Sequence, residues 1–264
     1  MVSPDVARQT STRRTQRLTA VLDRLATVGD IKVAELARSL AVSEATLRRD
    51  LALLEAQSLV RRTHGGATSQ DYASEMPVRY RNTQHRPAKQ RIAAACAATI
   101  ARKPQAVALS GGTTTSEVAR YLADRSELTI VTNAINIATE LAMRPRLRVI
   151  VTGGVLRSES YELVGAWTER FIEALNIGVA IMGVDGISAE GGLTTHDAVE
   201  ARTNQRMISR AQRVVVVADA TKLGQVTMSK MADIGEVDLL ITEADAPAEQ
   251  VATLRAAGLA VHLA

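Results

Sequence analysis

The stretch that decides the fold of the first third of the chain is Val33-Ala-Glu-Leu-Ala-Arg-Ser-Leu-Ala-Val-Ser-Glu-Ala-Thr-Leu-Arg-Arg-Asp-Leu51. Its apolar residues predict a short helix over residues 33–40, followed by a tight connection at Ala41-Val42. Ser43 is then the expected N-cap of a second helix, because its hydroxyl can accept from a free backbone N–H of the first turn. Two short helices joined by a tight turn are typical of a helix-turn-helix.

The flanking segments extend this pattern to a winged helix-turn-helix domain over residues 13–68. Upstream, a helix capped by Thr15 and ending near Val28 is predicted from the helical spacing of Leu18, Val21, Leu22 and Leu25. Downstream, residues 59–63 predict a strand and Gly65-Gly66 predicts a turn, so a hairpin follows the second helix of the motif.

The helix that begins at Ser43 has the side chains needed to read DNA. Leu47, Leu51 and Leu54 form one apolar stripe, and Arg49 points away from it because successive helical residues are about 100° apart. Arginine can bind guanine with two hydrogen bonds, and threonine can contact a base edge. The expected DNA-binding residues are Ser43, Thr46, Arg48 and Arg49 on the helix and Arg61, Arg62 and His64 on the hairpin. The alternative is an ordinary surface helix that carries arginines.

The charge distribution favours the DNA-binding interpretation. Residues 1–91 hold 16 Lys+Arg and 9 Asp+Glu, a net charge of +7, whereas residues 92–264 hold 16 and 19, a net charge of −3. A basic module joined to a near-neutral body is typical of proteins that bind a polyanion with one part only. Aromatic residues make up 2% of the chain, which excludes a base-stacking platform built on several aromatic rings.

The remainder of the chain predicts an α/β domain over residues 88–264, after a linker at residues 69–87 that is rich in Ser, Gln, Asn and Pro. Short aliphatic runs alternate there with helical stretches, which indicates a mostly parallel sheet covered on both faces. The predicted strands are 106–109, 128–132, 147–152, 179–182, 214–218 and 239–242.

Four loops that follow predicted strands are suited to a small anionic ligand. They are Ser110-Gly-Gly-Thr-Thr-Thr115, Thr132-Asn133, Gly153-Gly154 and Asp219-Ala-Thr-Lys222. The carboxyl ends of parallel strands meet at one edge of a sheet, so these loops are expected to converge. Glycines allow close approach, a helix N-terminus favours an anion, and hydroxyls bind a polyol. The expected ligand is a phosphorylated sugar, although each loop taken singly is more often a simple turn.

Both halves resemble the DeoR family of bacterial transcription regulators. The N-terminal resemblance rests on Val42-Ser43, Thr46-Leu-Arg-Arg-Asp-Leu51 and Arg62-Thr-His-Gly-Gly-Ala67, and the C-terminal one on Gly112-Thr-Thr-Thr115, Gly183-Val-Asp-Gly-Ile187 and Asp219-Ala-Thr-Lys-Leu-Gly224. The resemblance implies a C-terminal domain similar in fold to ribose-phosphate isomerase that senses phosphorylated sugars. It implies an effector site made of Gly112, Thr113, Thr114, Lys222 and neighbouring loop residues, with Asp185 and Glu200 facing the sugar. The expected effector-binding set also includes Thr132, Asn133, Gly153, Gly154 and Asp219.

The sequence departs from the family in two places and leaves more than one function open. Many members have an acidic residue where Ser110 stands and an aromatic residue where Leu223 stands. A sugar-phosphate isomerase fused to a DNA-binding domain is one alternative, because Asp185 and Glu200 could serve as carboxylate bases. Isomerases of that fold carry a lysine where this chain has Glu190, which argues for binding without turnover. The sequence is also compatible with a transcriptional activator and with a non-specific nucleic-acid binder.

The expected protein is therefore a DNA-binding repressor of carbohydrate uptake or catabolic genes, released by a phosphorylated sugar. Paired half-sites lead us to expect a homo-oligomer, a dimer or a tetramer. No metal or cofactor is expected, since the four His show no ligand spacing and one Cys excludes a multi-Cys zinc site. The longest uncharged apolar run, residues 92–101, is too short to span a bilayer, and no signal peptide is evident, so a cytoplasmic protein without membrane contact is expected.

Overall fold

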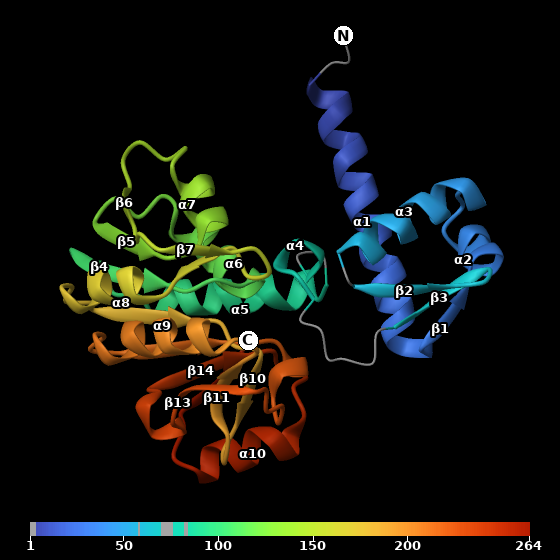
Figure 1. Cartoon of the computed structure of the whole chain (residues 1–264). Helices are drawn as coiled ribbons and strands as arrows, with labels where there is room; N and C mark the ends of the chain where they lie inside the picture. The colour runs from blue at the N-terminus through green and yellow to red at the C-terminus, as the bar shows by residue number, and fades with distance from the viewer. Residues whose placement is uncertain (1–3, 58, 70–75, 82–83) are drawn as a thin grey trace. The chain divides into compact units, whose positions relative to one another are not determined.

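The computed structural model describes residues 4–57, 59–69, 76–81 and 84–264 (Figure 1). The chain divides into two compact units, Met1–Gln84 and His85–Ala264. The first unit holds the N-terminal helical segment, and the second unit holds the segment in which strands and helices alternate.

The first unit is a winged helix-turn-helix. Its helices are α1 (Pro4–Val28), α2 (Val33–Ser39), α3 (Glu44–Ala56) and α4 (Val78–Arg81), and its strands are β1 (Asp30–Lys32), β2 (Val60–Thr63) and β3 (Gly66–Ser69). The strands form an antiparallel sheet in the order β1-β3-β2, so the wing hairpin is joined by a strand from the loop after α1. The buried side chains of α1, α2 and α3 form one core with Val60 and Ala67 of the wing.

The structure differs from the sequence prediction for this unit in one helix start and one additional strand. The first helix begins at Pro4 and not at Thr15, because residues 5–28 contain no Gly or Pro that would end it and Pro4 is compatible with a first helical turn. The three-residue strand β1 was not predicted, since only Ile31 of it is buried and so short a segment shows no alternation.

Part of the segment expected to be a linker packs on the first unit. Tyr80 of α4 is buried in the core of that unit, and its backbone carbonyl accepts from the Thr19 hydroxyl of α1 at 3.2 Å. The Tyr80 hydroxyl donates to Gln57, which lies at the end of α3, at 2.8 Å. Residues 70–75 and 82–83 of the expected linker lie outside the described residues.

The second unit is built on a seven-stranded sheet in the order β15-β14-β12-β9-β4-β5-β6, with parallel pairing throughout. Its strands are β4 (Gln105–Leu109), β5 (Leu128–Thr132), β6 (Arg148–Val151), β9 (Val179–Met182), β12 (Val214–Val217), β14 (Leu239–Thr242) and β15 (Val261–Leu263). Two smaller antiparallel sheets accompany it: β7 (Val155–Arg157) with β8 (Glu162–Val164), and β10 (Gly186–Ser188), β11 (Gly192–Thr195) and β13 (Ser229–Ala232).

Helices cover both faces of this sheet, as expected for a buried parallel sheet. One face packs against α5 (Arg86–Thr99), α6 (Thr113–Leu122) and α7 (Ile135–Leu141). The other face packs against α8 (Ala166–Glu173), α9 (Ala198–Ser209) and α10 (Ala248–Ala256), as can be followed in Figure 1. Alternation within β4 illustrates the two layers, since Val107 and Leu109 face the first set of helices and Ala108 faces the second.

The direction in which the chain adds strands to the sheet reverses between β4 and β9, and this position is the topological switch point of the sheet. From β4 the chain proceeds outward through β5 and β6, and from β9 it proceeds in the opposite direction through β12, β14 and β15. In open parallel sheets, ligands bind at the carboxyl ends of strands where the order reverses in this way. The loops after Leu109 and after Met182 meet at this point.

Candidate functional site

The apolar side of α3 packs in the core of the first unit, and its polar side is exposed. The Ser43 hydroxyl accepts from the Thr46 backbone N–H at 3.2 Å, which confirms the predicted N-cap. Leu47, Leu51 and Leu54 are all buried, as the apolar stripe predicted. Arg49 is exposed on the opposite side, whereas the guanidinium of Arg48 is paired with Glu44 at 2.7 Å. Arg49 is therefore the better placed of the two arginines for a base contact.

The wing presents a second group of polar side chains. Arg61, Arg62 and His64 are all exposed, on β2 and the turn that follows it. Glu55 of α3 accepts from the Arg62 backbone N–H at 3.1 Å and pairs with its guanidinium at 3.6 Å, so the wing is fixed to the end of α3. A helix and a fixed basic wing suit a duplex, where the helix contacts bases and the wing contacts phosphates.

At the switch point of the second unit, the loops after β4 and β9 contact each other directly. The Ser110 hydroxyl accepts from the Gly183 backbone N–H at 2.9 Å. A Cβ on Gly183 would lie 2.8 Å from the Gly111 carbonyl oxygen, so a larger residue at Gly183 would force the loops apart. Ser110, which stands where many members of the resembled family have an acidic residue, is thus fully buried and used within the fold.

The N-terminus of α6 faces this switch point and offers backbone donors. Gly112 is its N-cap, with a φ of 121° that favours glycine, and its carbonyl accepts from the hydroxyls of Thr115 at 3.0 Å and Ser116 at 2.7 Å. The first N–H groups of a helix have no intrahelical acceptor, which makes this ten-residue helix suited to an anion.

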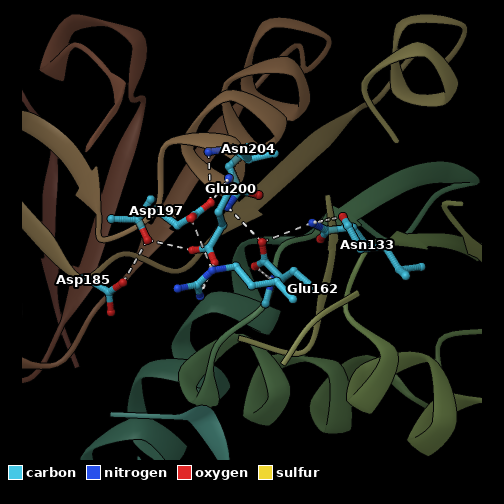
Figure 2. A network of polar contacts seen from close by, with 11 residues as sticks. Asn133, Glu162, Asp185, Asp197, Glu200 and Asn204 are labelled. Atoms are coloured by element: carbon cyan, nitrogen blue, oxygen red, sulfur yellow. Dashed lines mark hydrogen bonds and ion pairs between the residues drawn. The ribbon is translucent and has the colours of Figure 1, made fainter. Parts of the chain in front are cut away.

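A chain of polar contacts extends from this point across the second unit (Figure 2). The Thr195 hydroxyl lies 2.9 Å from Asp185 Oδ2 and 2.7 Å from Glu200 Oε1. Arg157 contacts Glu200 Oε2 at 3.1 Å and Asp197 Oδ2 at 3.7 Å, and Lys222 Nζ lies 3.9 Å from Asp185 Oδ1. The structure therefore brings together Asp185, Glu200 and Lys222, three residues of the predicted effector site.

Glu162 on β8 joins this network to the α6 loop. Its Oε1 accepts from the Gly111 backbone N–H at 2.5 Å, and its Oε2 accepts from the side-chain amides of Asn133 and Asn204, each at 3.2 Å. A Cβ on Gly111 would lie 2.3 Å from Glu162 Oε1, so glycine is required for this approach. Burial and the nearby Glu200 carboxylate raise the pKa of Glu162 well above its ordinary value.

The other predicted effector residues have different surroundings. The Thr132 hydroxyl is used within the fold, donating to Leu109 O and accepting from the Ala134 N–H. The Gly153 carbonyl accepts from the Thr168 hydroxyl of α8 at 2.5 Å, and Gly154 adopts a φ of 143°. Asp219 is buried, with Lys89 Nζ at 3.9 Å. Asp197 is the N-cap of α9, and its side chain accepts from Val199 N and Glu200 N.

Five residues of this region were missed by the sequence analysis: Lys89, Arg157, Glu162, Thr195 and Asn204. Lys89 and Asn204 had a sequence signal, because each shares the buried face of its helix with apolar residues at helical spacing, on α5 and α9 respectively. Arg157 and Glu162 lie opposite each other in the β7–β8 hairpin. No sequence motif predicts the pairing of these two strands.

The described residues contain no group of three or more His, Cys, Asp or Glu side chains arranged to hold a metal ion. Among the helices in the described ranges, none combines the length and the apolar character that a membrane span requires.

Comparison with known sequences finds matches along nearly the whole chain. Residues 17–73 match a pattern described as "DeoR-like helix-turn-helix domain", and residues 84–244 match one described as "DeoR C terminal sensor domain". The "Glycerol-3-phosphate regulon repressor" of Escherichia coli (strain K12) is 34% identical over 235 residues, 89% of this chain and 93% of that protein. The "HTH-type transcriptional regulator GlpR" of Haloferax volcanii is 36% identical over 230 residues, 87% of this chain and 89% of that protein.

Comparison with solved structures finds a distant likeness. Ribose 5-phosphate isomerase A from Neisseria gonorrhoeae matches with a TM-score of 0.38 and 14% identity, over 55% of this chain and 54% of that chain. A likeness of this size carries no conclusion about chemistry.

Proposed function

The chain belongs to the DeoR family of DNA-binding transcriptional regulators, and from that premise we propose that it represses a carbohydrate-related operon until a phosphorylated sugar binds its sensor domain. It is a regulator and not an enzyme, since its relatives are named as repressors and regulators. The observation that carries the sensing half of the proposal is the meeting of the β4 and β9 loops beside the N-terminus of α6.

The winged helix is the proposed operator-binding part, over residues 13–68. Arg49 reads a base edge in the major groove, flanked by Thr46 and Arg48, while Ser43 and the helix N-terminus lie near a phosphate. Arg61, Arg62 and His64 contact the backbone from the wing. Support comes from the exposure of these arginines, the buried stripe behind them and the net charge of +7 on residues 1–91 (16 − 9).

The second unit, residues 88–264, is the proposed sensor. Backbone N–H groups at Gly112, Thr113 and Thr114 bind the phosphate, and Lys222 supplies a cation at the same edge of the sheet. Asp185 and Glu200 accept from sugar hydroxyls, which is supported by their contacts with Thr195 and Lys222. The loops at Thr132, Asn133, Gly153, Gly154 and Asp219 complete the site.

The protein acts as a homo-oligomer, a dimer or a tetramer, in the cytoplasm, where operator DNA and sugar phosphates occur together. Effector binding changes the placement of the winged helices through the segment at residues 69–87. A coupling free energy of about 1–3 kcal/mol between the two sites would change operator affinity about 5–150-fold.

The test combines selection of operator DNA with effector titration. Purified protein captures fragments of the genome, which are sequenced, and the best fragment is labelled for fluorescence anisotropy. We expect tighter binding to this fragment than to random duplex at moderate salt, and release by one phosphorylated sugar but not by its unphosphorylated form. Equal binding to all duplexes would contradict the operator-binding half, and turnover of a sugar phosphate at an enzyme-like rate would contradict the sensing half.

A further inference from the structure

Glu162 differs from the other acids of the network in its surroundings. Each of the others has a cation within 4.0 Å: Asp185 has Lys222, and Glu200 and Asp197 share Arg157. In the described part of the chain, no Lys, Arg or His is found within that distance of Glu162, whose three contacts are all neutral N–H groups. Burying a carboxyl group without a cation beside it is costly.

The two amides that contact Glu162 each leave an oxygen without a partner. Asn133 and Asn204 are buried, and both use their amide nitrogen to donate to Glu162 from two sides (Figure 2). Their Oδ1 atoms are buried and have no hydrogen-bond partner among the described residues. The orientation of Asn133 is fixed independently, because its nitrogen also donates to the Leu163 carbonyl at 3.3 Å.

This cluster is therefore rich in acceptors. It offers the oxygens of the Glu162 carboxyl group, Asn133 Oδ1 and Asn204 Oδ1, while both asparagine amide nitrogens already donate to Glu162. Buried acceptors are normally satisfied, so a missing group with several N–H or O–H donors is indicated. An ammonium group carries three donors and a positive charge, and it supplies both things that the cluster lacks.

The cluster lies directly beside the proposed phosphate site, since Glu162 bonds to Gly111 and α6 begins two residues later. The next step rests on the proposed function. We propose that the effector is a phosphorylated amino sugar. Its amino group is bound by Glu162, Asn133 and Asn204, and its phosphate is bound at the N-terminus of α6. Glu162 is carried by β8, which pairs with β7 and also forms a bridge between Glu162 and Ala134, the residue that follows Asn133.

The experiment measures binding of matched sugars by isothermal titration calorimetry on the full chain. The probes are glucosamine 6-phosphate and galactosamine 6-phosphate, with glucose 6-phosphate and galactose 6-phosphate as partners that carry a hydroxyl in place of the amine. We expect one amino sugar phosphate to bind about tenfold or more tightly than its hydroxyl partner. Glucosamine without phosphate should not bind measurably.

Two variants test whether the cluster causes the preference for the amino sugar phosphate over its hydroxyl partner. Glu162→Gln and Asn204→Ala should each reduce the amino-over-hydroxyl preference to less than about threefold while phosphate-dependent binding persists. Glu159→Gln is the matched control, an exposed acid on the same hairpin that should leave the preference unchanged. Circular dichroism and an unchanged affinity for operator DNA establish that each variant is folded.

The outcomes separate this proposal from the proposed function. Equal affinity for the amino and hydroxyl partners, or a preference that survives in both folded variants, overturns the amino-sugar proposal and leaves phosphosugar sensing intact. If no sugar phosphate binds or releases operator DNA, phosphosugar sensing fails and the amino-sugar proposal falls with it.

Discussion

Arg17 of α1 donates through Nε to the Oδ2 of Asp50 on α3 at 2.5 Å, and Arg14 lies 3.4 Å from the other oxygen of the same carboxylate. Asp50 is 2% exposed, so it is the buried acid to which the first helix fixes the proposed recognition helix. The orientation of α3 within the first unit thus depends on an ion pair between residues that lie 33 positions apart in the sequence.

Asp50→Asn should therefore destabilise the winged helix. The substitution removes the charge that two arginines share, and we expect a loss of about 1–3 kcal/mol in the free energy of unfolding, measured by urea denaturation. Glu35→Gln is the control, because the Lys32–Glu35 pair is exposed and such pairs contribute about 0–1 kcal/mol. Equal effects of the two substitutions would show that Asp50 does not fix α3.

Arg49→Ala should relax operator selectivity. Loss of a base contact costs about 1–3 kcal/mol on the specific fragment and little on random duplex. Arg62→Ala should weaken binding to the specific fragment and to random duplex alike. It should also reduce the slope of log affinity against log salt concentration by about one, as expected for the loss of one phosphate contact. Fluorescence anisotropy over a salt series measures both effects. An Arg49→Ala protein with unchanged selectivity would remove Arg49 from base reading.

Lys222→Ala should leave operator binding intact and abolish release by the sugar phosphate. The side chain lies beside Asp185 at the edge of the sheet where the loops meet, and it is the cation proposed to face the ligand. Lys230→Ala is the control, since that lysine is exposed and pairs with Asp233. A Lys222→Ala protein that is still released at the same sugar phosphate concentration would show that the site lies elsewhere.

Glu162 should make the stability of the sensor depend on pH. Its pKa is raised above the ordinary 4.5 by burial and Glu200, so its proton is bound more tightly in the folded state. Stability that is fully present below pH 4.5 is lost as pH rises toward the raised pKa, with a slope of at most about 1.4 kcal/mol per pH unit. Urea denaturation between about pH 5 and pH 8 should show this loss in the natural protein and less of it in Glu162→Gln. If the free energy of unfolding changed with pH by the same amount in the natural protein and in Glu162→Gln, the loss would not come from Glu162.

The Cys96 thiol should be unreactive in the folded protein. It is fully buried on α5, and burial raises its pKa to about 12 despite the opposing effect of Arg213. Ellman's reagent, applied under mildly alkaline conditions, should modify it only at the rate at which the second unit unfolds, and at once in denaturant. Rapid modification of the native thiol would mean that α5 opens locally.

Several elements could be predicted because their signals are local. The strands at 128–132, 179–182 and 239–242 have the bounds that their aliphatic runs predicted, and the Ser43 cap and the buried stripe of α3 followed from spacing within one helix. Hydrophobic periodicity and capping involve residues within a turn or two, so the sequence alone contains them. The effector loops could also be expected to converge, because parallel strands end at one edge.

The amino-acid order thus determined the two-part plan, the N-cap and buried stripe of α3, and the Gly- and Thr-containing loops that follow the parallel strands. Only the tertiary structure decided which side chains meet there. Reversal of the strand order between β4 and β9 and the β7–β8 hairpin bring Gly111, Asn133, Glu162 and Asn204 into contact across up to 93 residues (204 − 111). A hydrogen bond depends on positions in space, and for residues this far apart those positions are set by the packing of the whole sheet.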